Sequence, residues 1–358
     1  MSTGLAQTWQ SQGELSVLGT GSAFPGPLVT TETLVRQAGL SGRQRTLAQS
    51  VAERMGVRTR HISRVWTGRI DTQAERASNP VLAAQAVDAA LRDAGLQVAD
   101  LGYLIAHTAT PAQPLPSNVA FVADILGFAG PHVELRQACT GFANALMIAF
   151  GLLAQPGARP VAIVGSETGS VFLDLERLEG HSGQIVNLVQ MGDGAGAVIL
   201  RPAGANADKI HAAWFGALGL HRPPGLQMCE GGSERSGTGH AGPLTFEHDF
   251  ASVLRGGAEL FDAGVQAASA RGFEVAQADW IIPHQASGRI GRQLAGYLDV
   301  PEERFLVNAD RVGNTGSAAI WTALAELRAR RPASGTLTIA LGAEATKYMF
   351  GGFVHETG

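Results

Sequence analysis

The hydrophobic positions of the chain form short runs of Val, Ile and Leu that alternate with longer Ala-rich stretches. Apolar residues at consecutive positions are typical of strands that are buried on both faces between helices. The Ala-rich stretches have the length and the small residues of buried helices. The alternation therefore predicts a layered α/β fold. The strands expected in the first half of the chain are Leu15–Thr20, Leu101–His107, His132–Gln137, Val161–Gly165 and Ala195–Leu200.

An internal repeat organises this alternation. The segment from Gly95 to His107 aligns without a gap with the segment from Gly272 to His284, at a shift of 177 residues. The same shift aligns residues 161–167 with residues 338–344. In each copy a small-residue helical stretch precedes a short apolar strand, and that strand ends at the histidine. Two independent stretches that share one offset indicate a duplicated structural unit.

The repeat divides the chain into two halves of the same plan, residues 1–200 and 201–358, connected by the segment Pro202–Lys209. With a slightly different gap, Cys139-Thr140-Gly141 of the first half falls opposite Asn314-Thr315-Gly316 of the second. Equivalent strand ends of the two halves would then converge on one cleft. The helices expected before the repeated strands are Ala83–Ala94 and Phe261–Arg271.

Composition and charge exclude several classes of protein. Hydrophobic residues make up 45% and charged residues 16% of the 358 residues, which indicates a folded chain with a large core. The formal net charge of −4 and the absence of a basic run argue against nucleic acid as a partner. With only two cysteines, Cys139 and Cys229, the chain has no disulfide framework and fits a reducing compartment.

No segment has the pattern of a secretory signal or of a membrane span. Residues 1–15 have neither a basic start nor an apolar core. The longest apolar stretch, Ala143–Ala154, is interrupted by Asn144 and is too short to cross a bilayer. We therefore expect a soluble, cytoplasmic protein without a membrane partner.

The first candidate for chemistry is Cys139. It follows the expected strand His132–Gln137 and opens the helical stretch Thr140–Leu153. The unpaired N–H groups and the positive dipole end of a helix favour the thiolate, which is the reactive form of cysteine. An isolated cysteine in apolar surroundings is more often an inert packing residue, so Cys139 alone does not establish a site.

His284 and Asn314 are the candidates from the second half. His284 directly follows the apolar strand Trp280–Ile282, at the strand end where α/β folds place their sites. Asn314 lies in a glycine-flanked turn ahead of the expected helix Ala318–Arg328. Taken singly, the histidine is compatible with a core or capping group and the asparagine with a turn residue. Their equivalent positions in the repeat favour a shared site with Cys139.

Other motifs point away from nucleotide and metal chemistry. The glycine segment 192–196 leads into the apolar strand Ala197–Leu200 and not into a helix, so tight backbone packing explains it better than phosphate binding. No Walker pattern, zinc-ligand spacing or Gly-x-Ser-x-Gly motif is present, and we expect no metal. Cys229 lies without partners in the Gly-, Pro- and Ser-rich segment His221–Gly242. This segment is either a lid at a site entrance or a surface insertion.

Short motifs along the whole chain carry a family resemblance. They are Leu18-Gly19-Thr20-Gly21-Ser22, Gly56-Val57-Arg58, Pro116-Ser117, Ala138-Cys139-Thr140-Gly141-Phe142, Gly192-Asp193-Gly194-Ala195-Gly196-Ala197, Pro283-His284-Gln285-Ala286 and Gly313-Asn314-Thr315. On these motifs the chain resembles the β-ketoacyl-acyl carrier protein synthase III group of thiolase-fold condensing enzymes. The resemblance implies a homodimer and a thiolase-like α/β fold, in which two pseudo-twofold related halves stack in an αβαβα arrangement. It also implies that Cys139, His284 and Asn314 form the catalytic triad.

The resemblance further implies a two-step reaction without an additional cofactor. Cys139 takes an acyl group from an acyl-CoA or acyl carrier protein thioester, and the backbone N–H groups of Cys139 and Ala343 hold the oxyanion. A malonyl-carrier thioester then loses carbon dioxide. His284 and Asn314 stabilise the enolate oxygen, and the carbanion attacks the acyl group on Cys139.

The resemblance also places residues around the triad. Leu115 would reach the acyl pocket from across the dimer interface, next to Phe142. Arg54, Arg289 and Arg292 would lie at the entrance, where acyl carrier protein or coenzyme A arrives. Arg292 is equally compatible with an ordinary helix-surface arginine.

Several positions depart from the family pattern for coenzyme A. Ser50 stands where an aromatic residue is usual, Ile185 where an arginine is usual, and Ser287 and Ala258 where polar residues of other types are usual. Loss of a stacking surface and of a phosphate partner weakens binding of an adenosine phosphate. We therefore hypothesise a specialised relative that is loaded from a carrier-protein thioester.

The C-terminal loop departs as well. In the family it is a run of glycines, whereas here Gly342 is followed by Ala343 and Glu344. A side chain in such a loop narrows the permitted backbone geometry. Because Glu344 matches Glu167 in the repeat, a structural role is favoured over a catalytic one.

Three other functions fit parts of the pattern. A thiolase needs a second cysteine as a base near the C-terminal loop, and Leu341–Phe350 contains none. An acyltransferase that passes the Cys139-bound group to a hydroxyl or an amine, without decarboxylation, stays open. A non-catalytic partner of a ketosynthase generally lacks the nucleophile, whereas all three triad positions are filled here.

Overall fold

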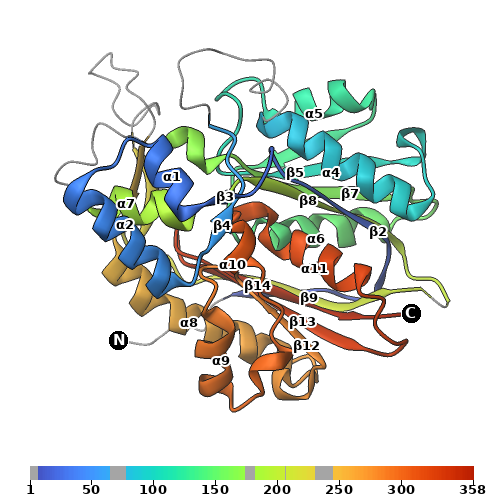
Figure 1. Cartoon of the computed structure of the whole chain (residues 1–358). Coiled ribbons are helices and arrows are strands. Elements are labelled where there is room, and N and C mark those ends of the chain that lie inside the picture. The colour runs from blue at the N-terminus through green and yellow to red at the C-terminus, as the bar shows by residue number, and fades with distance from the viewer. Residues whose placement is uncertain (1–6, 65–77, 174–181, 206, 230–244) are drawn as a thin grey trace.

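The computed structural model describes residues 7–64, 78–173, 182–205, 207–229 and 245–358. Its centre is a ten-stranded sheet to which both halves of the chain contribute (Figure 1). The first half provides β2 (Leu15–Ala23), β5 (Tyr103–His107), β6 (His132–Leu135), β7 (Val161–Glu167) and β8 (Gly194–Pro202). The second half provides β9 (Lys209–Ala217), β12 (Trp280–Pro283), β13 (Leu337–Glu344) and β14 (Met349–Glu356), and β1 (Thr8–Gln10) pairs with β9.

The strand order confirms the repeat. In the first half the order is β6-β5-β7-β8-β2, with β5 parallel to both neighbours and β8 antiparallel to β7 and β2. In the second half β12-β13-β14-β9 has the same order and the same directions. A single parallel bridge between Ile281 and Phe305 stands where the first half has β6. The two sheets join where Leu15 and Ser16 of β2 pair with β9.

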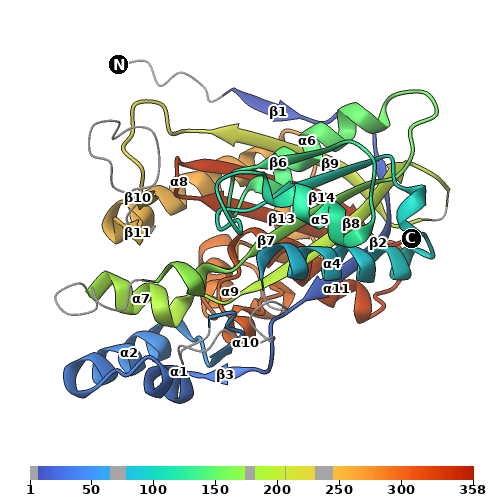
Figure 2. The same ribbon diagram turned by 90° about the horizontal axis from the view of Figure 1, so that it is seen from above.

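Helices cover both outer faces and fill the space between the sheets (Figures 1 and 2). On the first half, α4 (Asn79–Ala94) and α5 (Asn118–Leu126) pack against the outer face. On the second half, α8 (Phe250–Ser269) and α9 (Ile290–Leu298) do the same. Between the sheets lie α6 (Gly141–Leu153) and α11 (Ala319–Ala329), which share one core with strands of both halves. The layers therefore follow the expected αβαβα order.

The residue pattern of α6 explains its central place. Phe142, Leu146 and Phe150 follow one face of this helix at a spacing of four residues, and all of its alanines are buried as well. A helix that is apolar all round is stable only when it is enclosed on all sides. Its partners are strand residues of both halves, such as Ile105 and Ile282.

Glycines in β2 allow the outer helix α4 to approach closely. A Cβ atom on Gly21 would lie 2.3 Å from the carbonyl oxygen of Ala86, and one on Gly19 would lie 2.3 Å from that of Ala90. Backbone-to-backbone packing of this kind requires glycine. The glycines of the motif Leu18–Ser22 thus serve the packing of the first sheet.

The remaining elements cap one end of the layers. Helices α1, α2 and α7 pack together around Leu34, Val51, Ile185 and Leu188. The bounds are β3 Val29–Thr30, α1 Thr31–Gln37, α2 Gly42–Met55, β4 Thr59–Arg60, α7 Ser182–Gln190, β10 Leu226–Cys229, β11 Thr245–His248 and α10 Ala309–Val312. Short 3-10 turns are η1 Val98–Asp100, η2 Gly169–Phe172, η5 Val275–Gln277, η6 Glu302–Arg304 and η7 Gly316–Ala318.

Two expectations need correction or restriction. The helix expected at Phe261–Arg271 is longer at its start, since α8 begins at Phe250 and ends at Ser269. Gly256-Gly257 interrupts the apolar pattern of the sequence, but the helix continues through both glycines. Of the segment His221–Gly242, residues 230–242 lie outside the described residues, and the part before them contains β10, which pairs with β11. No helix among the described residues has the length and hydrophobicity needed to span a membrane.

Candidate active site

A cavity of about 520 Å³ contains all three predicted triad residues on its walls. Cys139 comes from the first half, and His284 and Asn314 come from the second. The rest of the lining is mainly apolar and includes Val253, Leu260, Phe261, Ile290, Leu294 and Leu341. The convergence expected from the repeat is therefore present, although the three residues are far apart in the sequence.

Cys139 lies between strand β6 and the central helix α6. Thr140 is the N-cap residue of α6, so the cysteine directly precedes the helix N-terminus as expected. The turn is tight because a Cβ atom on Gly141 would lie 2.4 Å from Nδ1 of His107. The buried Gln137 donates a hydrogen bond of 2.9 Å from Nε2 to Oγ1 of Thr140. The position of the sulfur is thus fixed from both sides of the turn.

His284 follows the end of β12. Its backbone N–H donates a hydrogen bond of 2.7 Å to the carbonyl oxygen of Leu341, which continues the ladder between β12 and β13. Its Nδ1 atom is buried and has no hydrogen-bond partner among the described residues. Burial lowers the pKa of His284 to about 4, so the imidazole is neutral near pH 7. A neutral imidazole can donate a hydrogen bond or accept a proton in the cavity.

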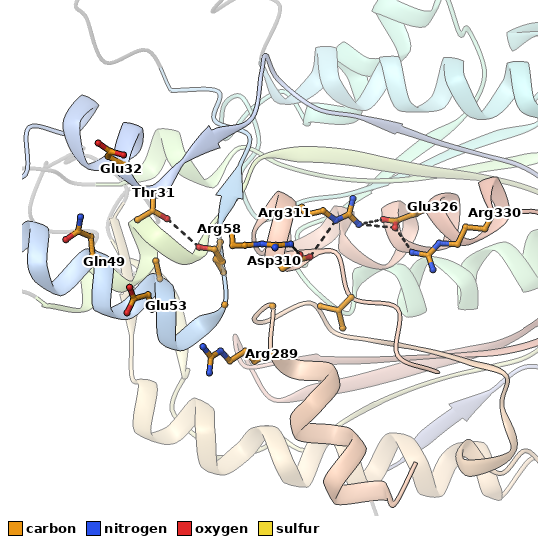
Figure 3. A pocket seen from close by; sticks show the side chains of 15 residues that line it. Thr31, Glu32, Gln49, Glu53, Arg58, Arg289, Asp310, Arg311, Glu326 and Arg330 are labelled. Atoms are coloured by element: carbon orange, nitrogen blue, oxygen red, sulfur yellow. Dashed lines mark hydrogen bonds and ion pairs between the residues drawn. The ribbon is translucent and has the colours of Figure 1, made fainter. Parts of the chain in front are cut away.

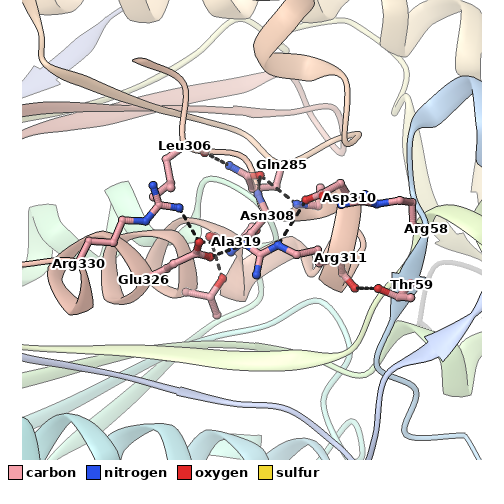
Figure 4. Close-up of polar contacts among 12 residues, drawn as sticks. Arg58, Thr59, Gln285, Leu306, Asn308, Asp310, Arg311, Ala319, Glu326 and Arg330 are labelled. Atoms are coloured by element: carbon pink, nitrogen blue, oxygen red, sulfur yellow. Dashed lines mark hydrogen bonds and ion pairs between the residues drawn. The ribbon is translucent and has the colours of Figure 1, made fainter. Parts of the chain in front are cut away.

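The buried amide of Gln285 connects His284 to the segment that leads to Asn314 (Figure 4). Its Nε2 atom donates to the carbonyl oxygens of Pro283 (2.9 Å) and Leu306 (3.0 Å). Its Oε1 atom accepts from the backbone N–H of Asn308 at 3.0 Å. A buried amide with this many partners fixes the relative position of the two strand ends.

Asn314 lies in a turn that begins at Gly313, whose φ of 74° is in the left-handed region. Its backbone N–H donates to the carbonyl oxygen of Gln190 at 2.8 Å. Its side-chain Oδ1 accepts from the backbone N–H of Gly316 at 3.0 Å. In the described part of the chain no hydrogen bond engages the amide NH₂ group, which therefore remains available as a donor.

The glycine segment 192–196 packs against this turn. The N–H of Gly192 donates to the carbonyl oxygen of Asn314 at 3.1 Å, and a Cβ atom on Gly192 would lie 1.8 Å from the carbonyl oxygen of Val312. The segment then continues into β8. The interpretation of these glycines as backbone packing is confirmed.

Two buried carboxylates, Glu167 and Glu344, also line the cavity. Burial raises the pKa of the Cys139 thiol, and the charges of Glu344 and then Glu167 raise it further. The expectation that the helix N-terminus makes Cys139 a thiolate is thus opposed by its surroundings. Sequence reasoning assigned Glu344 a structural role; its place on the cavity wall was not predicted.

His248 is a further histidine of the cavity wall, and it was not predicted as a site residue. It ends strand β11, and its Nδ1 lies 2.6 Å from Oδ1 of Asn187 on α7. Burial lowers the pKa of His248 to about 4. Among the described residues, no Lys or Arg lines the cavity, and no group of three or more His, Cys, Asp or Glu side chains could hold a metal ion.

The two predicted residues of the acyl pocket, Phe142 and Leu115, do not line this cavity. The ring of Phe142 is fully buried in the central core, where it meets Trp321 and Phe353 edge-on, and it does not line the cavity. Leu115 is 84% exposed in the loop between β5 and α5. An exposed leucine of this kind cannot form a pocket within one copy of the chain.

The predicted entrance arginines are exposed and lie outside the cavity. Arg54 belongs to the last turn of α2, and Arg292 forms an ion pair of 3.2 Å with Glu302. Arg289 lines a second groove, together with Arg58 and Asp310 (Figure 3).

The charges of this second groove balance one another. Asp310 pairs with Arg58 and Arg311, and Glu326 pairs with Arg311 and Arg330 (Figures 3 and 4). The four arginines that line the groove, Arg58, Arg289, Arg311 and Arg330, face four acidic residues, Glu32, Glu53, Asp310 and Glu326. Arg289 has no ion pair among the described residues, unlike the other three arginines of the groove.

Comparisons with known proteins identify related sequences. The family described as 3-Oxoacyl-[acyl-carrier-protein (ACP)] synthase III matches residues 133–219, and the family of its C-terminal part matches residues 268–354. A protein from Rhizorhabdus wittichii named Beta-ketoacyl-[acyl-carrier-protein] synthase III is 31% identical over 317 residues, which cover 86% of this chain and 88% of that protein.

Solved structures show the same architecture. The structure titled "AbyA1 - tetronic acid condensing enzyme" has a TM-score of 0.80 and 28% identity, and the match covers 96% of this chain and 99% of that one. A 3-oxoacyl-(acyl carrier protein) synthase III from Pseudomonas aeruginosa has a TM-score of 0.77 and 27% identity, and covers 97% of this chain and 98% of its own.

Proposed function

The chain belongs to the 3-oxoacyl-[acyl-carrier-protein] synthase III family of condensing enzymes, and from this premise we propose that Cys139, His284 and Asn314 carry out the reaction. The observation that supports these roles is their meeting in one largely apolar cavity. Because the relatives are named as synthases, the alternative of acyl transfer without decarboxylation is not favoured.

The first step is acylation of Cys139. The sulfur attacks the carbonyl carbon of an acyl thioester, and the thiol proton passes through the neutral imidazole of His284 to the leaving thiolate. The backbone N–H groups of Cys139 and Ala343, both on the cavity wall, hold the oxyanion. The original C–S bond breaks and a new thioester forms on the enzyme, with no cofactor beyond the substrates.

The second step is decarboxylation of a malonyl-carrier thioester. The bond to the carboxylate breaks, carbon dioxide leaves, and the electron pair forms a thioester enolate. The imidazole N–H of His284 and the NH₂ group of Asn314 donate hydrogen bonds to the enolate oxygen. The free NH₂ group of Asn314 and the neutral state of His284 support these roles.

The third step forms the carbon–carbon bond. The enolate carbon attacks the acyl carbonyl on Cys139, the C–S bond breaks, and the product is a β-ketoacyl thioester on the carrier. The thiolate of Cys139 takes up one proton and restores the resting enzyme. The walls of Leu260, Phe261 and Leu341 keep this part of the cavity apolar, which strengthens each hydrogen bond to the charged intermediates.

We further propose that the acyl donor is carried by an acyl carrier protein and not by coenzyme A. Ile185 of α7 is buried in the core that this helix shares with α2, where it offers no partner to a phosphate, and the exposed Ser50 offers no stacking surface. The named activity of the structural neighbour, a tetronic acid condensing enzyme, supports a place in specialised metabolism. Faster acylation of Cys139 from a matched acyl-CoA than from the acyl carrier would contradict this proposal.

A homodimer in the cytoplasm completes the proposal. The exposed side chain of Leu115 and the edge strand β6 are available to a second copy, which would supply Leu115 to the neighbouring acyl pocket. Light scattering tests the dimer. Leu115→Ala should then change the acyl-length preference without changing the rate of Cys139 alkylation.

Mass spectrometry of the intact protein tests the catalytic roles. Incubation with a panel of acyl-carrier and acyl-CoA thioesters should give an adduct on Cys139, and its mass identifies the primer. The matched control is Cys139→Ala, which should give no adduct. Labelled carbon dioxide should appear only with malonyl carrier. Acylation at another residue would overturn the assignment.

A further inference from the structure

Glu344 and Glu167 form a reciprocal arrangement across the two halves. Glu344, at the end of β13, accepts hydrogen bonds from the N–H (2.8 Å) and Oγ1 (2.7 Å) of Thr140 and from the N–H of Ala138 (3.4 Å). A fourth comes from the hydroxyl of Thr346 in its own loop. The second-half carboxylate therefore holds the residues on both sides of Cys139.

Glu167, at the end of β7, does the same for the other half. It accepts from the N–H and the hydroxyl of Ser317, three residues beyond Asn314. It also accepts from the N–H of Ala109 and the hydroxyl of Thr110 in its own half. Each carboxylate thus receives two N–H and two O–H donors and fixes the reactive turn of the opposite half.

The donors show what Glu344 does. A buried carboxylate that accepts four hydrogen bonds from the protein is held in one position. Its lone pairs are occupied by the protein, so it has no free position for a proton from substrate. Its effects are then two: it sets the geometry of the Cys139 turn, and it places a negative charge beside the sulfur.

Within the described part of the chain, the cavity wall holds no positive charge that offsets this effect. The cavity wall that carries Cys139 also carries Glu344, Glu167, His248 and His284, and His107 lies beside Gly141 of the Cys139 turn. Burial lowers the pKa of His107 to about 3 and those of His248 and His284 to about 4, so all three are neutral near pH 7. Among the described residues no Lys or Arg lines the cavity. The N-terminus of α6 is left as the main feature that favours the thiolate.

We propose that Glu344 is a positioning residue that anchors the Cys139 turn from the opposite half and keeps Cys139 a thiol until a thioester occupies the site. The inference rests on the proposed function of Cys139 and deepens it. Cys139 then reacts with a thioester whose carbonyl is aligned with the oxyanion donors and whose leaving group can receive the proton. Small electrophiles from solvent, which lack this alignment, react slowly.

The rate at which iodoacetamide alkylates Cys139, measured by mass spectrometry across pH, tests the proposal. In Glu344→Gln the midpoint of this profile should move down by about one to two pH units, because a negative charge is lost. At pH 7 alkylation should then be at least about tenfold faster, while condensation slows because the amide cannot accept all four donors. Glu326→Gln, which removes a carboxylate outside the cavity, is the matched control and should leave the profile unchanged.

A second variant distinguishes the effect of the Glu344 charge from the effect of its hydrogen bonds to the Cys139 turn. Glu344→Asp keeps the charge but shortens the reach, so condensation should fall while the alkylation midpoint stays near that of the native protein. An unchanged or higher midpoint in Glu344→Gln, or equal midpoints for the two variants, would overturn the inference. Because alkylation reads the sulfur directly, the result is independent of whether Cys139 accepts acyl groups. Failure of acylation would instead count against the proposed function.

Discussion

The two turns that meet in the cavity have the same scaffold but carry different chemistry. The first-half turn presents Cys139 and leads directly into α6. The second-half turn presents Asn314 and leads through η7 into α11. Each is held by a carboxylate from the other half, Glu344 or Glu167. The comparison shows two equivalent positions in the two halves. One carries the proposed nucleophile, Cys139, and the other carries a hydrogen-bond donor, Asn314.

The largest expected effect comes from removing the first-half group. Cys139→Ala should abolish condensation, by at least about 10⁴-fold, because no acyl group can be held. Decarboxylation of malonyl carrier should persist, since His284 and Asn314 remain in place. Carbon dioxide release and product formation, measured on the same sample, check this separation. Equal loss of both activities would show that the two turns do not act independently.

Removing the second-half donor should give the opposite result. In Asn314→Ala the decarboxylation rate should fall by about 10²- to 10³-fold, the typical cost of one oxyanion donor. Acylation of Cys139 should remain, because the first turn is intact. Mass spectrometry of the acyl-enzyme and carbon dioxide release are the two measurements. Loss of acylation in this variant would contradict the division of roles.

A third prediction compares stability across pH. The unfolded chain protonates His284 near pH 6.5, whereas the folded chain does so only at about pH 4. Between these values the unfolded state binds more protons, so the free energy of unfolding should fall as pH decreases from about 6.5 to about 4. His107 and His248 act in the same direction. His284→Asn should reduce the slope by about 1.4 kcal/mol per pH unit in urea titrations, whereas a substitution of the exposed His132 should not.

The smallest effect concerns the packing of the Asn314 turn. Gly192→Ala would place a Cβ atom 1.8 Å from the carbonyl oxygen of Val312, and should lower the free energy of unfolding by roughly 1–3 kcal/mol. Gly257→Ala is the control, since nothing lies within 4 Å of its Cβ position. Denaturant unfolding checks both. Decarboxylation should suffer more than acylation in Gly192→Ala, because the disturbance lies on the second-half side.

The fold could be predicted because the apolar strands and the internal repeat can be read directly from the sequence. The short apolar strands and the 177-residue repeat predict two similar halves, and the strand order β5-β7-β8-β2 recurs as β12-β13-β14-β9. Cys139, His284 and Asn314 could be selected because each lies where a strand or turn meets the next element. Their catalytic roles remain predictions until they are measured.

Other features depend on contacts between distant residues. Glu344 and Thr140 are separated by 204 positions, and no periodicity reveals their hydrogen bond. Phe142 was expected in the acyl pocket, but helical periodicity does not tell which sheet a ring on the enclosed helix α6 will face. Asp310, the acidic partner of Arg58, likewise lies 252 positions away along the chain.

Glu344 and Glu167 each hold the turn of the opposite half, and this has a consequence for cutting the chain into two fragments. Between β8 and β9 the connection runs through residues 202–209, and no part of either reactive turn lies in it. A fragment that ends in this connection would carry Cys139 on a turn whose hydrogen-bond acceptor, Glu344, is missing. The other fragment would carry Glu344 without its donors Ala138 and Thr140. Activity should therefore return only when the fragments recombine. By the same geometry, an ancestral protein that consisted of one half would have been active only when two copies associated.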